Sequence, residues 1–171
     1  PGDSIILDTA PVYKGYPADI GYSCSLGEHQ ELEKGREFLG KMRETILGLF
    51  NGSGLTGGDI CDAVAHHIKA AGYDVIHHRY PGAVLGHRLH AMNEKWHPPT
   101  FIPFSWQVFT RFLSEGVFPD LLNEEHRGDL QGAWAIEPHF GGQGWGCKFE
   151  EVLIVDKNGA RWLSPEAPWA R

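Results

Sequence analysis

Four carboxylates and one imidazole stand at the ends of stretches that we predict to be strands. They are Asp8, Asp19, Glu137, Glu150 and His87. The set offers hard oxygen ligands, one borderline nitrogen ligand and no thiolate. It suits two divalent first-row ions better than calcium, which prefers oxygen alone, or structural zinc, which prefers Cys and His. Two ions about 3.5–4 Å apart would be neutralised by bridging carboxylates and would activate a shared water.

Asp8 and Asp19 belong to a predicted β-hairpin at residues 5–24. β-prone apolar residues flank a centre rich in proline and glycine. A turn at Tyr13–Lys14 would place the two aspartates directly opposite each other. A turn at Lys14–Gly15 would shift the pairing of the strands by two residues and keep both aspartates on one face of the sheet. A shift by one residue would place them on opposite faces unless a β-bulge intervened. Like charges on one face repel, so we expect either a cation between them or a solvated face.

Glu137 and Glu150 belong to a second predicted hairpin. Glu137 ends the strand at 133–137, and Glu150 lies at the start of a strand at 149–155. The glycine-rich loop at 141–146 joins these strands, and it lacks the Lys-Ser/Thr of a phosphate-binding loop. The sequence therefore predicts two carboxylate-bearing hairpins. Taken singly, each of these two acids is better explained as a surface residue at a strand end.

Two helices are predicted from the apolar periodicity. The first runs from about residue 27 to residue 50, with apolar residues at spacings of three, four and seven. The second begins near Asp59, as a cap or first-turn acid, and ends at Gly72. A turn at 156–159 and a short return strand at 160–163 close the chain.

The other histidines are expected to be surface or hydrogen-bonding residues. His66 and His67 fall on the second predicted helix, at its surface or the edge of the core. The same roles are expected for His29, His77, His78, His126 and His139. Of these, His139 is close enough to Glu137 to line the same site.

Residues 98–128 form a long segment rich in Phe and Trp and broken by proline. Residues 105–115 could form a helix within it. So long and aromatic a connection is often a lid or an interface, and a buried packing segment is an equal alternative. We predict a single domain over residues 1–171 that contains this segment as an insert.

The bulk composition restricts the function. A net charge of −7 argues against a nucleic-acid partner, and no apolar run approaches the length of a membrane span. Three widely spaced cysteines point to reduced thiols, and signal-peptide features are absent, so we expect a cytoplasmic protein. The chain begins at Pro1 without a methionine, and we expect further sequence upstream.

The motifs resemble those of the pita-bread metallopeptidases, which include prolidase, aminopeptidase P and methionine aminopeptidase. PGDSIILDTAPVYKGYPADI resembles that family's PGD-x-x-x-x-D…GY-x-x-D segment. GH at 86–87, IEP at 136–138 and FEEVLIVDKNGARWLS at 149–164 resemble its later motifs, in the same order. The resemblance implies an α/β (α+β) pita-bread fold, with a curved antiparallel sheet, helices on the outside and an incomplete first αββ unit.

The resemblance also implies a role for each ligand. Asp8 resembles the ligand of one metal only, and His87 and Glu137 resemble ligands of the other. Asp19 and Glu150 resemble the two bridging carboxylates, with Glu151 as the alternative to Glu150. Glu150 is preferred because the family sets this Glu five positions before a valine. The residue at the Glu137 position also passes a proton from the bridging water.

The family's second histidine, expected seven residues after His87, is replaced here by Glu94. His97, after a three-residue insertion, or His90 could take its place and stabilise the tetrahedral oxyanion. The catalytic residues implied are therefore Glu137 with His97 or His90.

Together these motifs predict a dinuclear hydrolase of peptide or amide bonds, of the Xaa-Pro dipeptidase or aminopeptidase type. The two divalent ions would be Mn, Co, Fe or Zn, with Mn favoured. The expected partner is a small peptide, with no nucleic acid and no membrane, and the family resemblance adds a homodimer. The alternatives are a weakly active or inactive relative acting as a binding module, or a creatinase-like C–N hydrolase.

Overall fold

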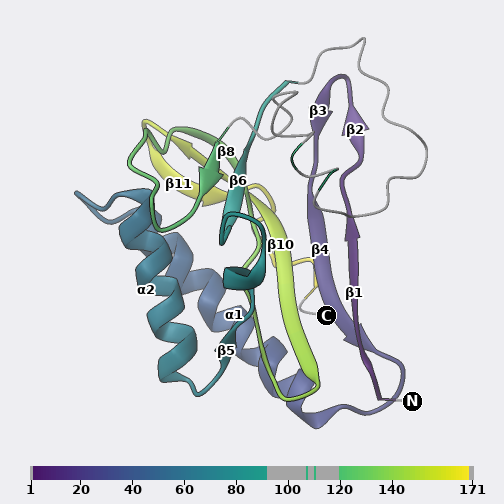
Figure 1. Cartoon of the computed structure of the whole chain (residues 1–171). Helices are drawn as coiled ribbons and strands as arrows, with labels where there is room; N and C mark the ends of the chain where they lie inside the picture. Colours follow the sequence, from purple (N-terminus) through teal and green to yellow (C-terminus); the bar gives the residue numbers. More distant parts are fainter. Residues whose placement is uncertain (1, 92–106, 108–109, 111–119, 170–171) are drawn as a thin grey trace.

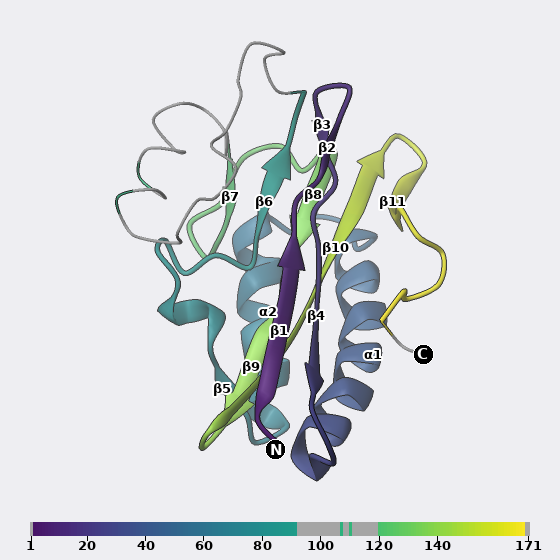
Figure 2. The same cartoon turned by 90° about the vertical axis from the view of Figure 1, so that its right-hand side faces the viewer.

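The computed structural model describes residues 2–91, 107, 110 and 120–169. Its centre is a nine-stranded sheet in which β1 (Ser4–Thr9), β4 (Ile20–Ser25), β10 (Trp145–Asp156), β8 (Gly132–Ile136), β6 (Gly86–Leu89) and β7 (Leu121–Leu122) are successive neighbours. Three further strands pair beside this path: β5 (Asp74–Val75), β9 (His139–Gly142) and β11 (Gly159–Trp162). The pairings among the described strands are antiparallel. The sheet is curved and both helices cover one face of it (Figures 1 and 2), so the predicted fold class is confirmed.

The helices form where the apolar periodicity predicts them. Helix α1 (Gln30–Phe50) buries the stripe Leu32, Leu39, Met42, Ile46 and Phe50 against the sheet. Helix α2 (Gly57–Ala70) begins at a capping box, in which the Thr56 hydroxyl accepts from the Asp59 amide and the Asp59 carboxylate accepts from the Thr56 amide. Asp59 is therefore the first-turn acid, and Thr56, which was not predicted, is the cap.

Strand β10 is the longest of the described strands and pairs with four of them. It pairs with β4, β8, β9 and β11. The prediction placed its start at residue 149, but it begins at Trp145, because the glycine-rich segment continues into the β9–β10 hairpin. This strand therefore holds side chains from its own sequence against the first hairpin on one side and β8 on the other.

The first hairpin adopts the second of the two predicted pairings, in which the turn is formed by Lys14 and Gly15. Tyr13 pairs with Tyr16 between β2 (Val12–Tyr13) and β3 (Tyr16–Pro17), so the turn is Lys14–Gly15. Both turn residues have positive φ, 50° and 80°, as a tight hairpin turn requires. Asp8 therefore pairs with Gly21, and the arrangement with Asp8 directly opposite Asp19 is wrong.

Most of the predicted aromatic insert, 98–128, and His97 lie outside the described residues. At the end of that segment, β7 pairs with β6. Within the part of the chain that the structure describes, no helix combines the length and apolar character needed to cross a membrane. The three cysteines are free thiols.

Candidate metal centre

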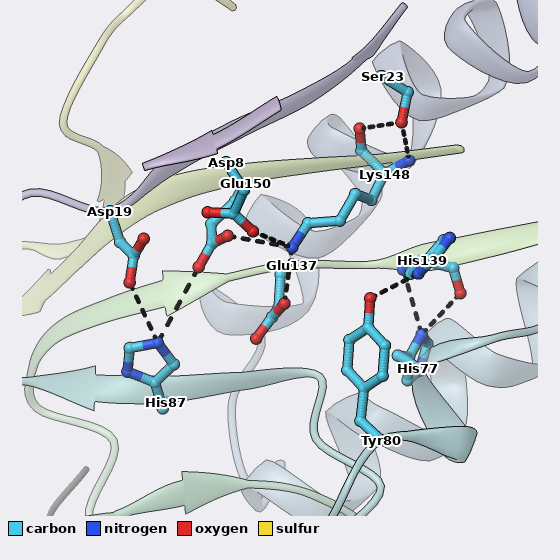
Figure 3. Close-up of polar contacts among 10 residues, drawn as sticks. All are labelled: Asp8, Asp19, Ser23, His77, Tyr80, His87, Glu137, His139, Lys148 and Glu150. Carbon is cyan, nitrogen blue, oxygen red and sulfur yellow. Dashed lines mark hydrogen bonds and ion pairs between the residues drawn. The ribbon is translucent and has the colours of Figure 1, made fainter. Parts of the chain in front are cut away.

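Strand β10 divides its charged residues between the two faces of the sheet. Figure 3 shows Lys148 and Glu150 on the same side of the strand. Successive side chains in a strand point to opposite faces, so Glu151 lies on the other face. Glu151 accepts from Arg43 of α1, with Nε–Oε1 and Nη2–Oε2 distances of 2.9 Å each. It also accepts from the indole of Trp169 at 2.6 Å. Glu151 is therefore a structural anion, and Glu150 is the candidate ligand.

Asp19, His87 and Glu150 converge at one place. Their ligand atoms all lie within 4.8 Å of one another. His87 Nε2 is 3.3 Å from Asp19 Oδ2 and 4.0 Å from Glu150 Oε1 (Figure 3). Only 8 %, 7 % and 3 % of the three residues is exposed, in that order. Buried carboxylates beside an imidazole nitrogen form a donor set that suits a divalent ion of the Mn, Fe, Co or Zn type.

The other two predicted ligands, Asp8 and Glu137, are brought to the same region by a lysine. The Lys148 ammonium is 2.9 Å from Asp8 Oδ2, 2.9 Å from Glu137 Oε2 and 3.1 Å from Glu150 Oε2 (Figure 3). All five predicted ligands therefore face one another, but three of them contact this lysine. The prediction missed Lys148, although its position two residues before Glu150 places it on the same face of the strand.

The charges of these groups depend on burial. Burial raises the pKa of Glu137, and Lys148 opposes this shift. Burial and the neighbouring Glu137 raise the pKa of Glu150 well above its usual range, and Lys148 acts to lower this pKa as well. For Lys148, burial acts to lower the pKa, but Glu137, Glu150 and Asp8 outweigh it and hold the pKa above its ordinary value. The lysine is therefore a cation that compensates for the buried acids.

Tyr80 and His139 lie beside Lys148, and His77 contacts the backbone of His139. The Tyr80 hydroxyl and His139 Nδ1 are 2.5 Å apart, and His77 Nδ1 is 3.1 Å from the His139 carbonyl (Figure 3). Burial lowers the pKa of both His77 and His139 to about 4, so both are neutral at pH 7. Burial raises the pKa of Tyr80 to about 12. His139 thus lies at the edge of the site, as its closeness to Glu137 in sequence suggests.

The histidines with no predicted catalytic or ligand role lie at the surface or form polar contacts, as expected. His29 caps α1 by accepting from the Leu32 amide at 3.1 Å, and His126 contacts Asp120 at 3.2 Å. His78 lies 3.5 Å from Glu124. His66 and His67 are exposed on α2. His90 follows β6, with a buried Nδ1 that has no hydrogen-bond partner among the described residues.

A cavity of about 250 Å³ lies beside β1 and β4. Its lining includes Leu7, Tyr22 and Trp169, and Asp8 also contributes to it. Trp169 donates to Glu151, which is on the sheet face opposite the three converging ligands. None of those three ligands lines the cavity, so it is distinct from the place where a metal ion would bind.

Comparisons with known proteins agree with this geometry. The family model described as "Metallopeptidase family M24" matches residues 1–157. A search of curated proteins gave no match. An X-Pro aminopeptidase from Thermotoga maritima MSB8 is similar in structure, with a TM-score of 0.66 and 19 % identity over 98 % of this chain and 40 % of that chain.

Two further solved structures are similar. A dipeptidase from Pyrococcus horikoshii OT3 has a TM-score of 0.67 and 23 % identity, over 99 % of this chain and 40 % of that one. The N-terminal domain of the FACT complex subunit SPT16 from Eremothecium gossypii has a TM-score of 0.62 and 16 % identity, over 95 % of this chain and 34 % of that one. At these identities the likeness shows the fold alone. The chain spans about 40 % of the length of the two peptidases.

Proposed function

Because the chain belongs to metallopeptidase family M24, we propose that it carries the metal-binding part of a hydrolase that cleaves Xaa-Pro bonds near a peptide N-terminus. The observation that carries the proposal is the convergence of Asp19, His87 and Glu150. These residues are far apart in sequence and buried together. Two buried carboxylates at this distance repel each other, and a bound divalent ion would remove that cost.

The donor set defines what the site can do. A divalent ion held by Asp19, His87 and Glu150 would lower the pKa of a water molecule and polarise the scissile carbonyl. The resemblance implies two ions. However, Lys148 already contacts three of the five expected ligands, so the proposal is built on the ion at the triad. We favour Mn, with Co, Fe and Zn as alternatives.

Glu137 is the proposed proton acceptor. It directly follows β8, and its side chain, 14 % exposed, points toward Lys148 and the triad (Figure 3). A carboxylate in this position can take a proton from the attacking water and return it to the leaving amine. His90 or His97 would stabilise the developing oxyanion. The Xaa-Pro preference is supported by the family motifs and by the similarity to the X-Pro aminopeptidase.

The proposal is tested by measuring metal-dependent turnover of a Xaa-Pro dipeptide. The intact protein is stripped with a chelator, reloaded with Mn²⁺ or Co²⁺ and compared with the variants H87A and E137Q. We expect turnover that requires metal, little turnover in H87A, and retained metal binding with a rate at least about 100-fold lower in E137Q. The exposed-histidine variant H66A is the matched control for His87. Equal rates in wild type and E137Q would contradict the role given to Glu137.

A binding module is the second candidate function. It is favoured by the lysine inside the ligand set and by the structural similarity to a FACT complex subunit, which is not named as a peptidase. The same assay separates the two candidates. Bound metal with no turnover of Xaa-Pro, Xaa-Ala or N-terminal Met peptides would support the module and contradict the hydrolase.

The state of the thiols supports a proposal for the location. Cys24, Cys61 and Cys147 are all free, and burial raises the pKa of Cys61 and Cys147 to about 12. Such thiols are poorly reactive and suit a reducing compartment. We therefore propose a cytoplasmic protein.

A further inference from the structure

The Lys148 ammonium is enclosed by carboxylates from three separate elements. Asp8 is on β1, Glu137 follows β8 and Glu150 is on β10. Each accepts one hydrogen bond, at 2.9, 2.9 and 3.1 Å. A lysine ammonium has three donors, so its capacity is fully used. Its side chain is 4 % exposed, so the contacts are not those of a surface lysine.

The backbone fixes Lys148 in this place. The Ser23 hydroxyl donates to the Lys148 carbonyl at 3.1 Å and accepts from its amide at 2.8 Å (Figure 3). Lys148 also pairs with His139 across the β9–β10 hairpin. With the backbone held on both sides, the side chain extends along the face that bears Glu150.

Glu150 connects two cation positions. Its Oε1 lies 4.0 Å from His87 Nε2, on the side of Asp19. Its Oε2 lies 3.1 Å from Lys148 Nζ, on the side of Asp8 and Glu137. The four carboxylates therefore create two adjacent places for positive charge, with one oxygen of Glu150 directed to each.

We propose that the Lys148 ammonium permanently fills one of these places, so that the chain binds one divalent ion, at Asp19, His87 and Glu150, and not two. This inference depends on the proposed function in one respect: it requires a metal ion bound by Asp19, His87 and Glu150. A second ion would need the oxygens of Asp8 and Glu150 that already accept from the lysine. The second ion would also lie next to the buried Lys148 ammonium, and two positive charges in adjacent buried positions repel each other strongly. The divalent ion and the ammonium would thus share Glu150 as a bridge.

The two aspartates of the first hairpin provide a matched test. The intact protein and the variants D8N and D19N are dialysed against Mn²⁺, and bound metal per chain is measured by mass spectrometry. We expect one ion in wild type, one in D8N, because Asp8 contacts the lysine, and at least a tenfold weaker site in D19N. Two ions in wild type, falling to one in D8N, would overturn the inference and leave the proposed function standing.

Removing the charge of Lys148 tests directly whether this lysine excludes a second ion. In K148Q the second place is vacated, so we expect two ions per chain, falling to one in K148Q/D8N. The electron paramagnetic resonance signal of Mn²⁺ should change from that of an isolated ion in wild type to that of a coupled pair in K148Q. One ion in a folded K148Q would contradict the inference. If K148Q does not fold, the wild-type and D8N counts decide. No specifically bound ion in any variant would overturn both this inference and the proposed metal centre.

Discussion

Glu150 and Glu151 are neighbours on β10 whose carboxylates lie on opposite faces of the sheet. Glu150 faces His87 and Lys148, and Glu151 is held by Arg43 of α1. One residue therefore belongs to the candidate metal centre and the next to the packing of helix on sheet. The same chemical change at these two positions should have different effects.

The change from Glu to Gln at each position tests this division. E150Q should weaken Mn²⁺ binding by more than about 100-fold, because even the loss of an outer partner of a ligand costs about 10–100-fold. E151Q should leave the Mn²⁺ affinity of the folded protein unchanged and lower the free energy of unfolding by about 3–5 kcal/mol, because it removes the buried carboxylate that pairs with the Arg43 guanidinium. Titration calorimetry and urea denaturation measure the two effects. Weakened metal binding in E151Q with intact binding in E150Q would show that the two roles are reversed.

The Arg43–Glu151 pair should show strong coupling. Both side chains are nearly buried, with 6 % and 3 % exposed. R43M leaves the Glu151 carboxylate without its cation, and E151L leaves Arg43 with only the exposed Glu44 carboxylate at 3.7 Å. The double variant should be more stable than the sum of the two single losses predicts, by at least about 1 kcal/mol. The exposed pair Arg161 and Asp156 is the control, and it should show little coupling because solvent screens exposed ion pairs. Additive losses at Arg43 and Glu151 would show that the two charges do not depend on each other.

Two glycines of α1 should respond oppositely to alanine. A Cβ at Gly35 would lie 2.9 Å from the ring of Trp145, whereas a Cβ at Gly40 would meet nothing within 4 Å. G35A should therefore lower the free energy of unfolding by about 1–3 kcal/mol. G40A should raise it by about 0.5–1 kcal/mol, because alanine loses less backbone entropy in a helix. Urea denaturation of both variants checks this, and a stabilised G35A would show that α1 does not pack closely on Trp145.

His77 should make the fold sensitive to acid. Burial lowers its pKa to about 4 in the fold, against about 6.5 in an unfolded chain. Between these two values the unfolded state binds more protons, so stability is fully present above about pH 6.5 and is lost as the pH falls toward 4. The loss from this residue is at most about 3 kcal/mol. H77N should lose less stability than wild type over that pH range, and H66N, at an exposed histidine, should follow wild type. Parallel pH profiles for H77N and wild type would contradict the assignment.

Local sequence signals were sufficient for most of the elements. The apolar stripe of α1, the first-turn acid Asp59 and the β-prone run before Val155 depend on neighbours within a few positions. The register of the first hairpin was not determined, because the observed turn needs a positive φ at Lys14, where the side chain gives no preference for it. The sequence was therefore compatible with two pairings of this hairpin, and the structure shows which of them forms.

The sequence predicted which residues would gather at the candidate site but not the lysine among them. The motif order named five candidate ligands, of which Asp19, His87 and Glu150 converge in the structure. Arg43, which holds Glu151 on the other face, lies 108 positions away from it in sequence. Lys148 was missed because a long side chain can reach many places, and its contact with Asp8 joins residues 140 positions apart. A lysine two residues before a predicted ligand in a strand was the available signal.

Anomalous X-ray diffraction from Mn²⁺-loaded crystals of the intact protein would locate the bound ion itself. We predict a strong peak within about 2.5 Å of the Asp19 and Glu150 carboxylates and His87 Nε2, the range of metal–ligand bonds. A site at other residues, or no peak at this triad under saturating Mn²⁺, would contradict the metal centre.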